Sequence, residues 1–256
     1  MLSSCILSIG KEIVTGIIND TNSTYIASRL SSIGILNRFI ASTDDDENDI
    51  IETFLYFLDR VDIVITTGGL GPTFDDMTVP SVAKALGKRL ILDREAYEKI
   101  REFYASLYRE GKIDSAQMNP KREKMAYVPE GSKLLRNRTG AAPGIYMEIN
   151  GKHVFCLPGV PSEMKPMFDK EVFPILSNLS DGVIVSKTYE FEINDESKLG
   201  EYVDKLKDSG VYIKSLPAGF DSPVMAVRFT TRCKEEAECL KRIEYVRAEL
   251  EKMLRS

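Results

Sequence analysis

The stretch VDIVITTGGLGPTFDDMT, residues 61–78, decides the fold. Its first six residues are almost all apolar, as expected for a parallel strand that is covered on both faces. Three glycines and two aspartates follow, and helical periodicity resumes near Thr78. A buried strand that leads through a glycine-rich loop into a helix predicts an open α/β sheet, in which ligands bind beyond the carboxyl ends of the strands.

The loop itself predicts a phosphate site. Closely spaced glycines allow backbone N–H groups to converge, and the start of the next helix adds partial positive charge. Asp75 and Asp76 would repel a bare phosphate there. A divalent cation such as Mg²⁺ resolves this conflict because it binds carboxylate and phosphate oxygens together. The alternative is structural: the glycines make a tight turn and the aspartates cap the helix.

The segments on either side extend the same pattern. Apolar runs at residues 5–9 and 35–41 are expected to be strands, and residues 22–33 and 46–60 have helical periodicity. Asn150-Gly151 predicts a hairpin, and Pro161 begins a further helix. The expected fold class is therefore α/β, with a doubly wound, mostly parallel sheet. A polar stretch near residues 178–182 separates a domain of residues 1–178 from a small α+β domain of residues 182–256.

Further polar clusters follow other predicted strands. Gly10-Lys11-Glu12 and Thr43-Asp44-Asp45-Asp46 are expected on the same edge of the sheet as the glycine loop. The segments at 137–140 (NRTG) and 158–163 (PGVPSE) flank the hairpin. Each has a structural alternative: Asp46 could cap its helix, and Glu163 could favour a helix dipole.

Composition excludes several classes of protein. The 256 residues are 43% hydrophobic and carry a net charge of −5, which argues against a nucleic-acid binder. No apolar run approaches the roughly 20 residues that span a bilayer, and the N-terminus lacks the features of a signal peptide. The four cysteines form no CxxC pair; Cys5 and Cys156 read as core residues and His153 as a strand residue. A cytoplasmic location is expected.

Four motifs carry a resemblance to a known family: GKEIVTGIINDTN (10–22), TTGGLGPTFDDMT (66–78), NRTGAAPG (137–144) and LPGVPSEMK (157–165). In this order they resemble the CinA (competence/damage-inducible protein) family, which is related to the molybdopterin-binding domains of molybdenum-cofactor biosynthesis. The C-terminal part resembles a KH-like domain, expected to act as a scaffold or in homo-oligomers. The nicotinamide-mononucleotide deamidase domain of longer members would follow Ser256. One departure is Ala141, where the family usually has a threonine.

The resemblance implies a metal-dependent hydrolase that releases AMP from ADP-ribose or FAD. Its alternatives are a molybdopterin-binding protein or adenylyltransferase, and a nucleotide-binding protein without catalytic activity. The expected partners are thus a nucleotide or pterin, with no nucleic acid and no membrane. The implied catalytic residues are Asp45 and Asp76. The implied ligands of Mg²⁺ or another divalent cation are Glu12, Asp45, Asp75 and Asp76. The implied phosphate- or nucleotide-binding residues are Gly68, Gly69, Gly71, Thr73, Asn137, Gly140, Gly144 and Glu163.

Overall fold

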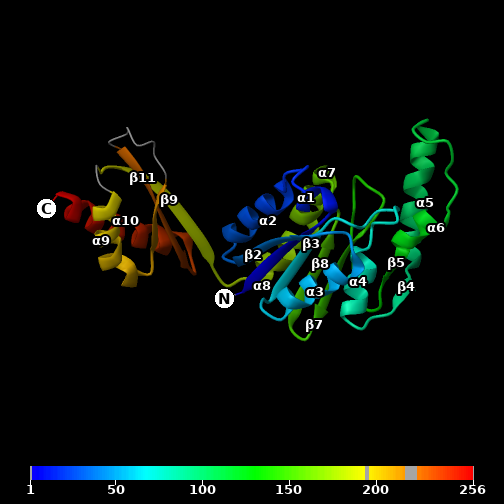
Figure 1. The fold of residues 1–256 in the computed structure, drawn as a ribbon, viewed down its shortest axis with the longest axis horizontal. Coiled ribbons are helices and arrows are strands. Elements are labelled where there is room, and N and C mark those ends of the chain that lie inside the picture. Colours follow the sequence, from blue (N-terminus) through cyan, green and yellow to red (C-terminus); the bar gives the residue numbers. More distant parts are fainter. Residues whose placement is uncertain (1, 194–195, 217–223, 256) are drawn as a thin grey trace. The chain divides into compact units, whose positions relative to one another are not determined.

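A computed structural model describes residues 2–193, 196–216 and 224–255. The chain divides into two compact units, one of residues 2–30 and 36–179, the other of residues 31–35 and 180–256. The larger unit contains a six-stranded sheet in the order β2-β1-β3-β8-β7-β6 (Figure 1). Its strands are β1 (Ser3–Ile9), β2 (Leu36–Thr43), β3 (Ile63–Thr67), β6 (Lys133–Leu135), β7 (Gly144–Ile149) and β8 (Lys152–Leu157).

The sheet is mostly parallel, which confirms the expected fold class. Strands β2, β1, β3 and β8 run parallel, whereas β7 pairs antiparallel with both β8 and β6. Both faces are covered, because Cys5, Ile6 and Leu7 alternate between the faces and all have 0% exposure. Cys5 and Leu7 belong to a core that also contains Ile50, Phe54 and Val82 from the helices beyond β2 and β3. Strand β2 lies on one side of β1 and β3 on the other, so the connections to these two strands diverge at β1. This is a topological switch point of the sheet.

The helices of this unit alternate with the strands along the first half of the chain, as the periodicity predicts. Asp46 caps α3 by accepting hydrogen bonds from the amides of Asn48 and Asp49. The helices are α1 (Lys11–Val14), α2 (Thr21–Ser32), α3 (Glu47–Leu58), α4 (Thr78–Ala85), α5 (Arg94–Arg109), α6 (Pro120–Glu123), α7 (Pro161–Met167) and α8 (Phe173–Leu179), with a 3-10 turn η1 (Lys124–Ala126) and a π-helical turn η2 (Phe168–Val172).

Two regions differ from the sequence-based expectation. The sequence between residues 110 and 135 is polar and shows no periodicity that predicts a strand, but it contains β6 and also β5 (Tyr127–Pro129), which pairs antiparallel with β4 (Leu90–Leu92). Strands of three residues are too short to show an alternating pattern. The helix expected from Pro161 onward is interrupted by η2, which Pro166 and Pro174 flank; proline provides no N–H for helical hydrogen bonds.

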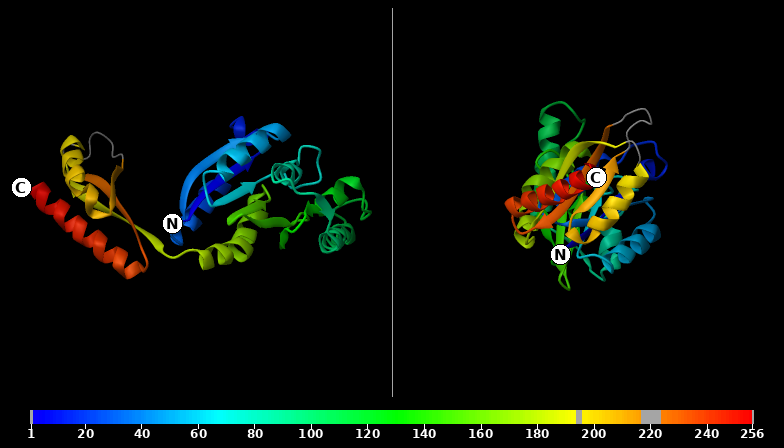
Figure 2. Two further views of the ribbon diagram at one scale, coloured as in Figure 1. Left: turned by 90° about the horizontal axis from the view of Figure 1, so that it is seen from below. Right: turned by 90° about the vertical axis from the view of Figure 1, so that its left-hand side faces the viewer.

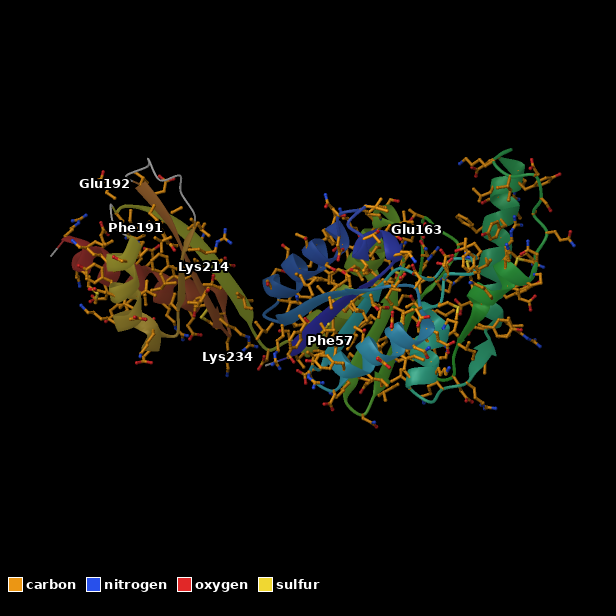
Figure 3. The ribbon with its side chains drawn as sticks, viewed as in Figure 1. Phe57, Glu163, Phe191, Glu192, Lys214 and Lys234 are labelled. Carbon is orange, nitrogen blue, oxygen red and sulfur yellow. A yellow bond between two sulfur atoms is a disulfide. The ribbon has the colours of Figure 1, made fainter. Side chains whose placement is uncertain are left out.

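The smaller unit is a three-stranded antiparallel sheet in the order β10-β11-β9. Helix α10 runs along one face of this sheet (Figure 2). Its core includes Phe191, which Figure 3 labels, together with Phe229 and Ile243. Its elements are β9 (Val183–Glu192), α9 (Glu196–Leu206), the 3-10 turn η3 (Lys207–Ser209), β10 (Tyr212–Leu216), β11 (Val224–Cys233) and α10 (Glu236–Arg255).

The cysteines divide between the two units. Cys5 and Cys156 are buried free thiols, as expected for core residues. Cys233 and Cys239 form a disulfide, with their Cα atoms 5.5 Å apart, although the sequence contains no CxxC pair and a cytoplasmic location is expected. The turn between β11 and α10 brings these two residues together. His153 lies in β8, where the Tyr146 hydroxyl is 3.0 Å from its Nδ1.

Candidate functional site

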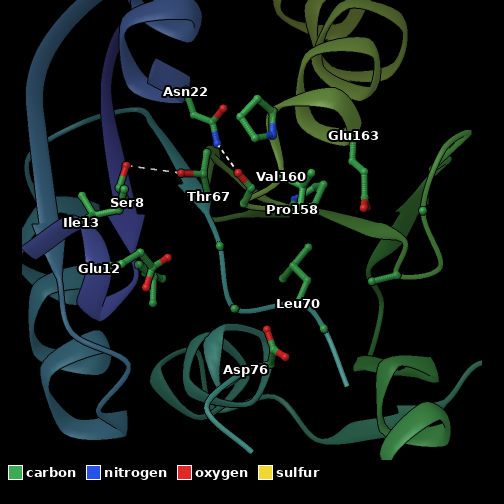
Figure 4. Close-up of a pocket in the computed structure, with 18 of the residues that line it drawn as sticks. Ser8, Glu12, Ile13, Asn22, Thr67, Leu70, Asp76, Pro158, Val160 and Glu163 are labelled. Atoms are coloured by element: carbon green, nitrogen blue, oxygen red, sulfur yellow. Dashed lines mark hydrogen bonds between the residues drawn. The ribbon is translucent and has the colours of Figure 1, made fainter. Parts of the chain in front are cut away.

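A cavity of about 630 Å³ lies at the carboxyl ends of β1, β3 and β8 (Figure 4). The loops that follow these strands form it together with residues from α1 and α7. The volume is within the range of about 300–1,000 Å³ that is typical of small-molecule sites. Of the residues predicted for the site, those that line the cavity are Glu12, Asp45, Gly68, Gly69, Gly71, Asp75, Asp76, Gly140 and Glu163.

Gly68 and Gly69 are required for the path of the glycine loop. Gly68 has φ +103°, and a Cβ there would overlap the carbonyl oxygen of Ile9. Its amide donates to the carbonyl of Leu157, 3.0 Å away, and is therefore engaged within the sheet. Gly69 has φ +67°, and a Cβ there would overlap the hydroxyl of Thr78. The two glycines hold the loop between β1, β8 and the start of α4, so their role is close backbone approach.

The next amides along the loop are the ones that could bind a ligand. Gly69, Leu70 and Gly71 all line the cavity. Within the described parts of the chain, their N–H groups donate to no acceptor. Three successive N–H groups beside a cavity are donors suited to a phosphate.

The position of Thr73 does not fit its predicted role as a phosphate ligand. Its amide donates to Asp76 Oδ2 at 2.8 Å, and its hydroxyl contacts the carboxylates of both Asp75 and Asp76. These bonds stabilise the turn from within, and Thr73 does not line the cavity. The aspartates also do not cap α4, because its N-cap residue is Met77, which makes no side-chain cap bond. Lys124 Nζ donates to the carbonyls of Thr73 and Asp76 and so holds the loop from outside.

Asp45 lies at the cavity near the charges of Glu12 in α1 and Asp75 in the glycine loop. Asp45 Oδ2 accepts a hydrogen bond from the amide of Lys11 at 2.9 Å, which ties the loop after β2 to α1. Burial raises the pKa of Asp45, the Lys11 amide opposes the rise, and the charges of Glu12, Asp75 and Asp44 add to it. The repulsion among these carboxylates is the kind that a bound cation relieves. The described residues contain no preformed cluster of three or more metal-ligating side chains.

The charge of the cavity wall is entirely acidic. Its six carboxylates have no lysine, arginine or histidine beside them among the described residues of the lining. A phosphate that approaches the glycine loop would therefore meet these carboxylates, whose charge Lys124 offsets at Asp75, and a cation that accompanied the phosphate would relieve the repulsion. Mg²⁺ is usually held by one or two carboxylates together with substrate phosphates. The donor set of Glu12, Asp45 and Asp75 fits such a cation arriving with its ligand.

A second group of predicted residues gathers around Glu163. Its Oε2 accepts a hydrogen bond from Asn137 Nδ2 at 2.7 Å. A Cβ at Gly140 would overlap the same carboxylate. Asn137 does not line the cavity itself. Gly144 is the first residue of β7, and a Cβ there would lie 2.5 Å from Met167 Sδ. The structure thus gives Gly144 a packing role away from the cavity.

Several polar residues at the cavity were not predicted. Asp20 Oδ1 accepts from the amide of Ser23 at 2.9 Å, and its Oδ2 accepts from the Ser8 hydroxyl at 2.5 Å. The Ser8 oxygen lies 3.3 Å from Thr67 Oγ1 (Figure 4). Asn22 Nδ2 donates to the carbonyl of Gly159. Asp20 directly precedes α2 and accepts from its first turn, so a capping pattern at this helix was the signal that could have found it.

Comparison with known proteins agrees with this architecture. A family model described as a probable molybdopterin binding domain matches residues 5–178. The crystal structure of the protein CinA with unknown function from Thermoplasma acidophilum is 35% identical, has a TM-score of 0.62, and covers 68% of this chain and 97% of its own. This chain belongs to the CinA family. Among other relatives, Protein PF0476 of Pyrococcus furiosus is 42% identical over 245 residues, 95% of each chain.

The family membership places the cavity in the part of the chain that the molybdopterin-binding model matches. All the residues that line the cavity fall between positions 8 and 163. In the described residues, no helix has the length and apolar character needed to span a membrane.

Proposed function

We propose that the cavity binds a small molecule that carries a phosphate, and that this molecule is a pterin of the molybdopterin class. The observation that carries the proposal is the row of uncommitted amides at Gly69, Leu70 and Gly71 on the cavity wall. The family model that matches residues 5–178 supports the pterin.

A divalent cation completes this site. Asp45, with Glu12 and Asp75 beside it, would hold the cation where it can also meet the ligand's phosphate. When bound, the cation neutralises phosphate charge in a cavity whose own wall is acidic. Asp76 fixes the loop through the Thr73 amide, which keeps the three donor amides in place.

Pterin fluorescence tests the proposal. The probe is neopterin monophosphate, titrated with the full chain in the presence of Mg²⁺ and again with a chelator. We expect saturable binding that needs Mg²⁺ and weakens strongly for neopterin without phosphate. Equal binding of the two pterins would show that the glycine loop does not engage a phosphate, and would rule out the proposed site.

Hydrolysis of a nucleotide pyrophosphate is the second candidate function. The observation that favours it is that Glu12, Asp45 and Asp75 line the same cavity as the glycine-loop amides, with the charges of Glu12 and Asp75 acting on Asp45, because hydrolytic metal sites use such carboxylates. Water would attack one phosphorus of ADP-ribose, the bridging P–O bond would break, and AMP and ribose 5-phosphate would leave.

This reaction is tested by incubating the protein with ADP-ribose or FAD and several divalent ions, followed by chromatography for AMP. We expect AMP release that is lost in Asp76→Asn and in Asp45→Asn. Tight pterin binding without AMP from either dinucleotide would leave the first function alone.

A further inference from the structure

The carboxylate of Glu163 is held in a single orientation at the cavity wall. The side chain extends from the first turn of α7 toward the cavity (Figure 4). Asn137 Nδ2 donates to Glu163 Oε2 at 2.7 Å and also to the carbonyl of Ala142 at 2.9 Å. Asn137 Oδ1 accepts from the amide of Gly140 at 2.8 Å. Both amide hydrogens and the amide oxygen of Asn137 are therefore committed, which fixes its orientation and that of the carboxylate it contacts.

Most of the hydrogen-bonding capacity of Glu163 remains available. An ionised carboxylate has about four acceptor positions, and Asn137 occupies one of them. In the described chain, no other group donates to Glu163 and no cationic side chain forms an ion pair with it. A fixed, unneutralised carboxylate at a cavity wall accepts hydrogen bonds and donates none. It therefore favours a ligand edge that carries adjacent N–H groups.

The surroundings of Glu163 fit a flat ring. Phe103, Tyr104 and Val160 line the same cavity, with the Phe103 and Tyr104 rings 5.8 Å apart. Gly140 has no side chain, and the Glu163 carboxylate occupies the position that a Cβ of residue 140 would take. Aromatic and aliphatic side chains of this kind pack against the faces of a heterocycle, while its edge meets the polar group.

We propose that Glu163 reads the heterocycle of the ligand by accepting two hydrogen bonds from a 2-amino-4-oxopyrimidine edge. This edge, shared by pterins and guanine, presents an amino group beside a ring N–H. Adenine presents an amino group beside a ring nitrogen lone pair, which the carboxylate repels. The inference rests on the proposed function, because it concerns the ring of a ligand whose phosphate lies at the glycine loop. It makes Glu163 a specificity-determining residue.

The experiment compares neopterin monophosphate, GMP and AMP as ligands of the full chain with Mg²⁺, by calorimetry. For the wild type, we expect AMP to bind about 10- to 100-fold more weakly than both other ligands, since bonds to a charged acceptor are lost. Glu163→Gln presents an amide N–H₂ to the ligand once its oxygen accepts from Asn137. We expect this variant to lose affinity for neopterin monophosphate and GMP, and to gain affinity for AMP. Glu148→Gln, an exposed change on β7, is the matched control.

The outcomes separate this inference from the phosphate site. Equal affinities of all three ligands, or an equal effect of Glu163→Gln on each, would overturn the role of Glu163 and leave phosphate binding intact. Failure of all three to bind would overturn both. If neopterin monophosphate binds more tightly than GMP, the preferred ring is a pterin. If GMP binds more tightly, the preferred ring is guanine. If Glu163→Gln does not fold, Glu163→Asp, which keeps the charge but withdraws it from the ring, should weaken the two edge-bearing ligands and spare AMP.

Discussion

The backbone of Gly68 lies directly against the carbonyl oxygen of Ile9, so that a β-carbon at position 68 would overlap this oxygen. The contact joins the loop after β3 to the end of β1, the two strand ends between which the cavity opens. The path of the glycine loop therefore depends on the absence of a side chain at Gly68, as it also does at Gly69.

Gly68→Ala should destabilise the protein and abolish ligand binding. Gly87→Ala is the matched control, because Gly87 also has a left-handed φ, +62°, but has no atom within 4 Å of the added methyl group. We expect about 1–2 kcal/mol of destabilisation from backbone strain at Gly87, and about 2 kcal/mol more at Gly68 from the overlap. Urea unfolding measures both. Similar costs at the two positions would contradict the close packing of Gly68.

Asp45→Asn should separate cation binding from stability. The amide oxygen of the substituted side chain can still accept from the Lys11 amide, while the charge that Glu12 and Asp75 repel is removed. We expect an unchanged or slightly higher free energy of unfolding, and at least about a tenfold loss of Mn²⁺ affinity, followed by electron paramagnetic resonance. Asp59→Asn, at a side chain with 85% exposure, is the control. An unaltered Mn²⁺ affinity would remove Asp45 from the cation site.

Asp46→Ala should lower the stability and leave cation binding unchanged, which is the reverse of the result expected for Asp45→Asn. Asp46 Oδ1 accepts from the amides of Asn48 and Asp49, at 2.8 and 3.2 Å, and caps α3. Loss of such a cap costs about 1 kcal/mol. Because Asp46 does not line the cavity, ligand and cation affinities should stay at the wild-type level. A loss of cation affinity as large as that of Asp45→Asn would show that the two aspartates act together.

Stability should fall as the pH rises above 9. Burial raises the pKa of the Cys5 thiol from 9.0 to about 12 and that of Cys156 to about 11. In the unfolded chain both thiols ionise near pH 9, so between pH 9 and 11 the unfolded state binds fewer protons than the folded state. The free energy of unfolding then decreases by up to about 1.4 kcal/mol per pH unit for each thiol.

Urea midpoints measured from about pH 8 to 10.5, a range that spans the ionisation of an unfolded thiol, check this dependence. Cys156→Ala should have a shallower slope than the wild type, because one of the two protected thiols is gone. A wild-type slope in the Cys5→Ala, Cys156→Ala double variant would show that other groups cause the pH dependence.

The sequence alone determined the order of the main strands and helices in the larger unit and the position of the glycine loop. Both follow from local physics. The short, β-branched apolar run at residues 61–66, followed by glycines, favours a buried strand. The closely spaced glycines allow a backbone path, with left-handed φ at Gly68 and Gly69, that few other residues adopt. The short strands β4, β5 and β6 escaped prediction because their pairing depends on partners far along the chain.

Only the tertiary structure decided which polar residues meet. Asp45 and Glu12 are brought together by the parallel pairing of β1 with β2, and Asn137 reaches Glu163 across 26 residues of chain. Threonine and glycine are both common in ligand sites. Thr73, however, forms hydrogen bonds within its own loop, and Gly144 packs against Met167. Periodicity and motifs indicate which side chains of one segment face the core and where its backbone can turn. Which side chains become partners depends on how segments that are distant in sequence pack together.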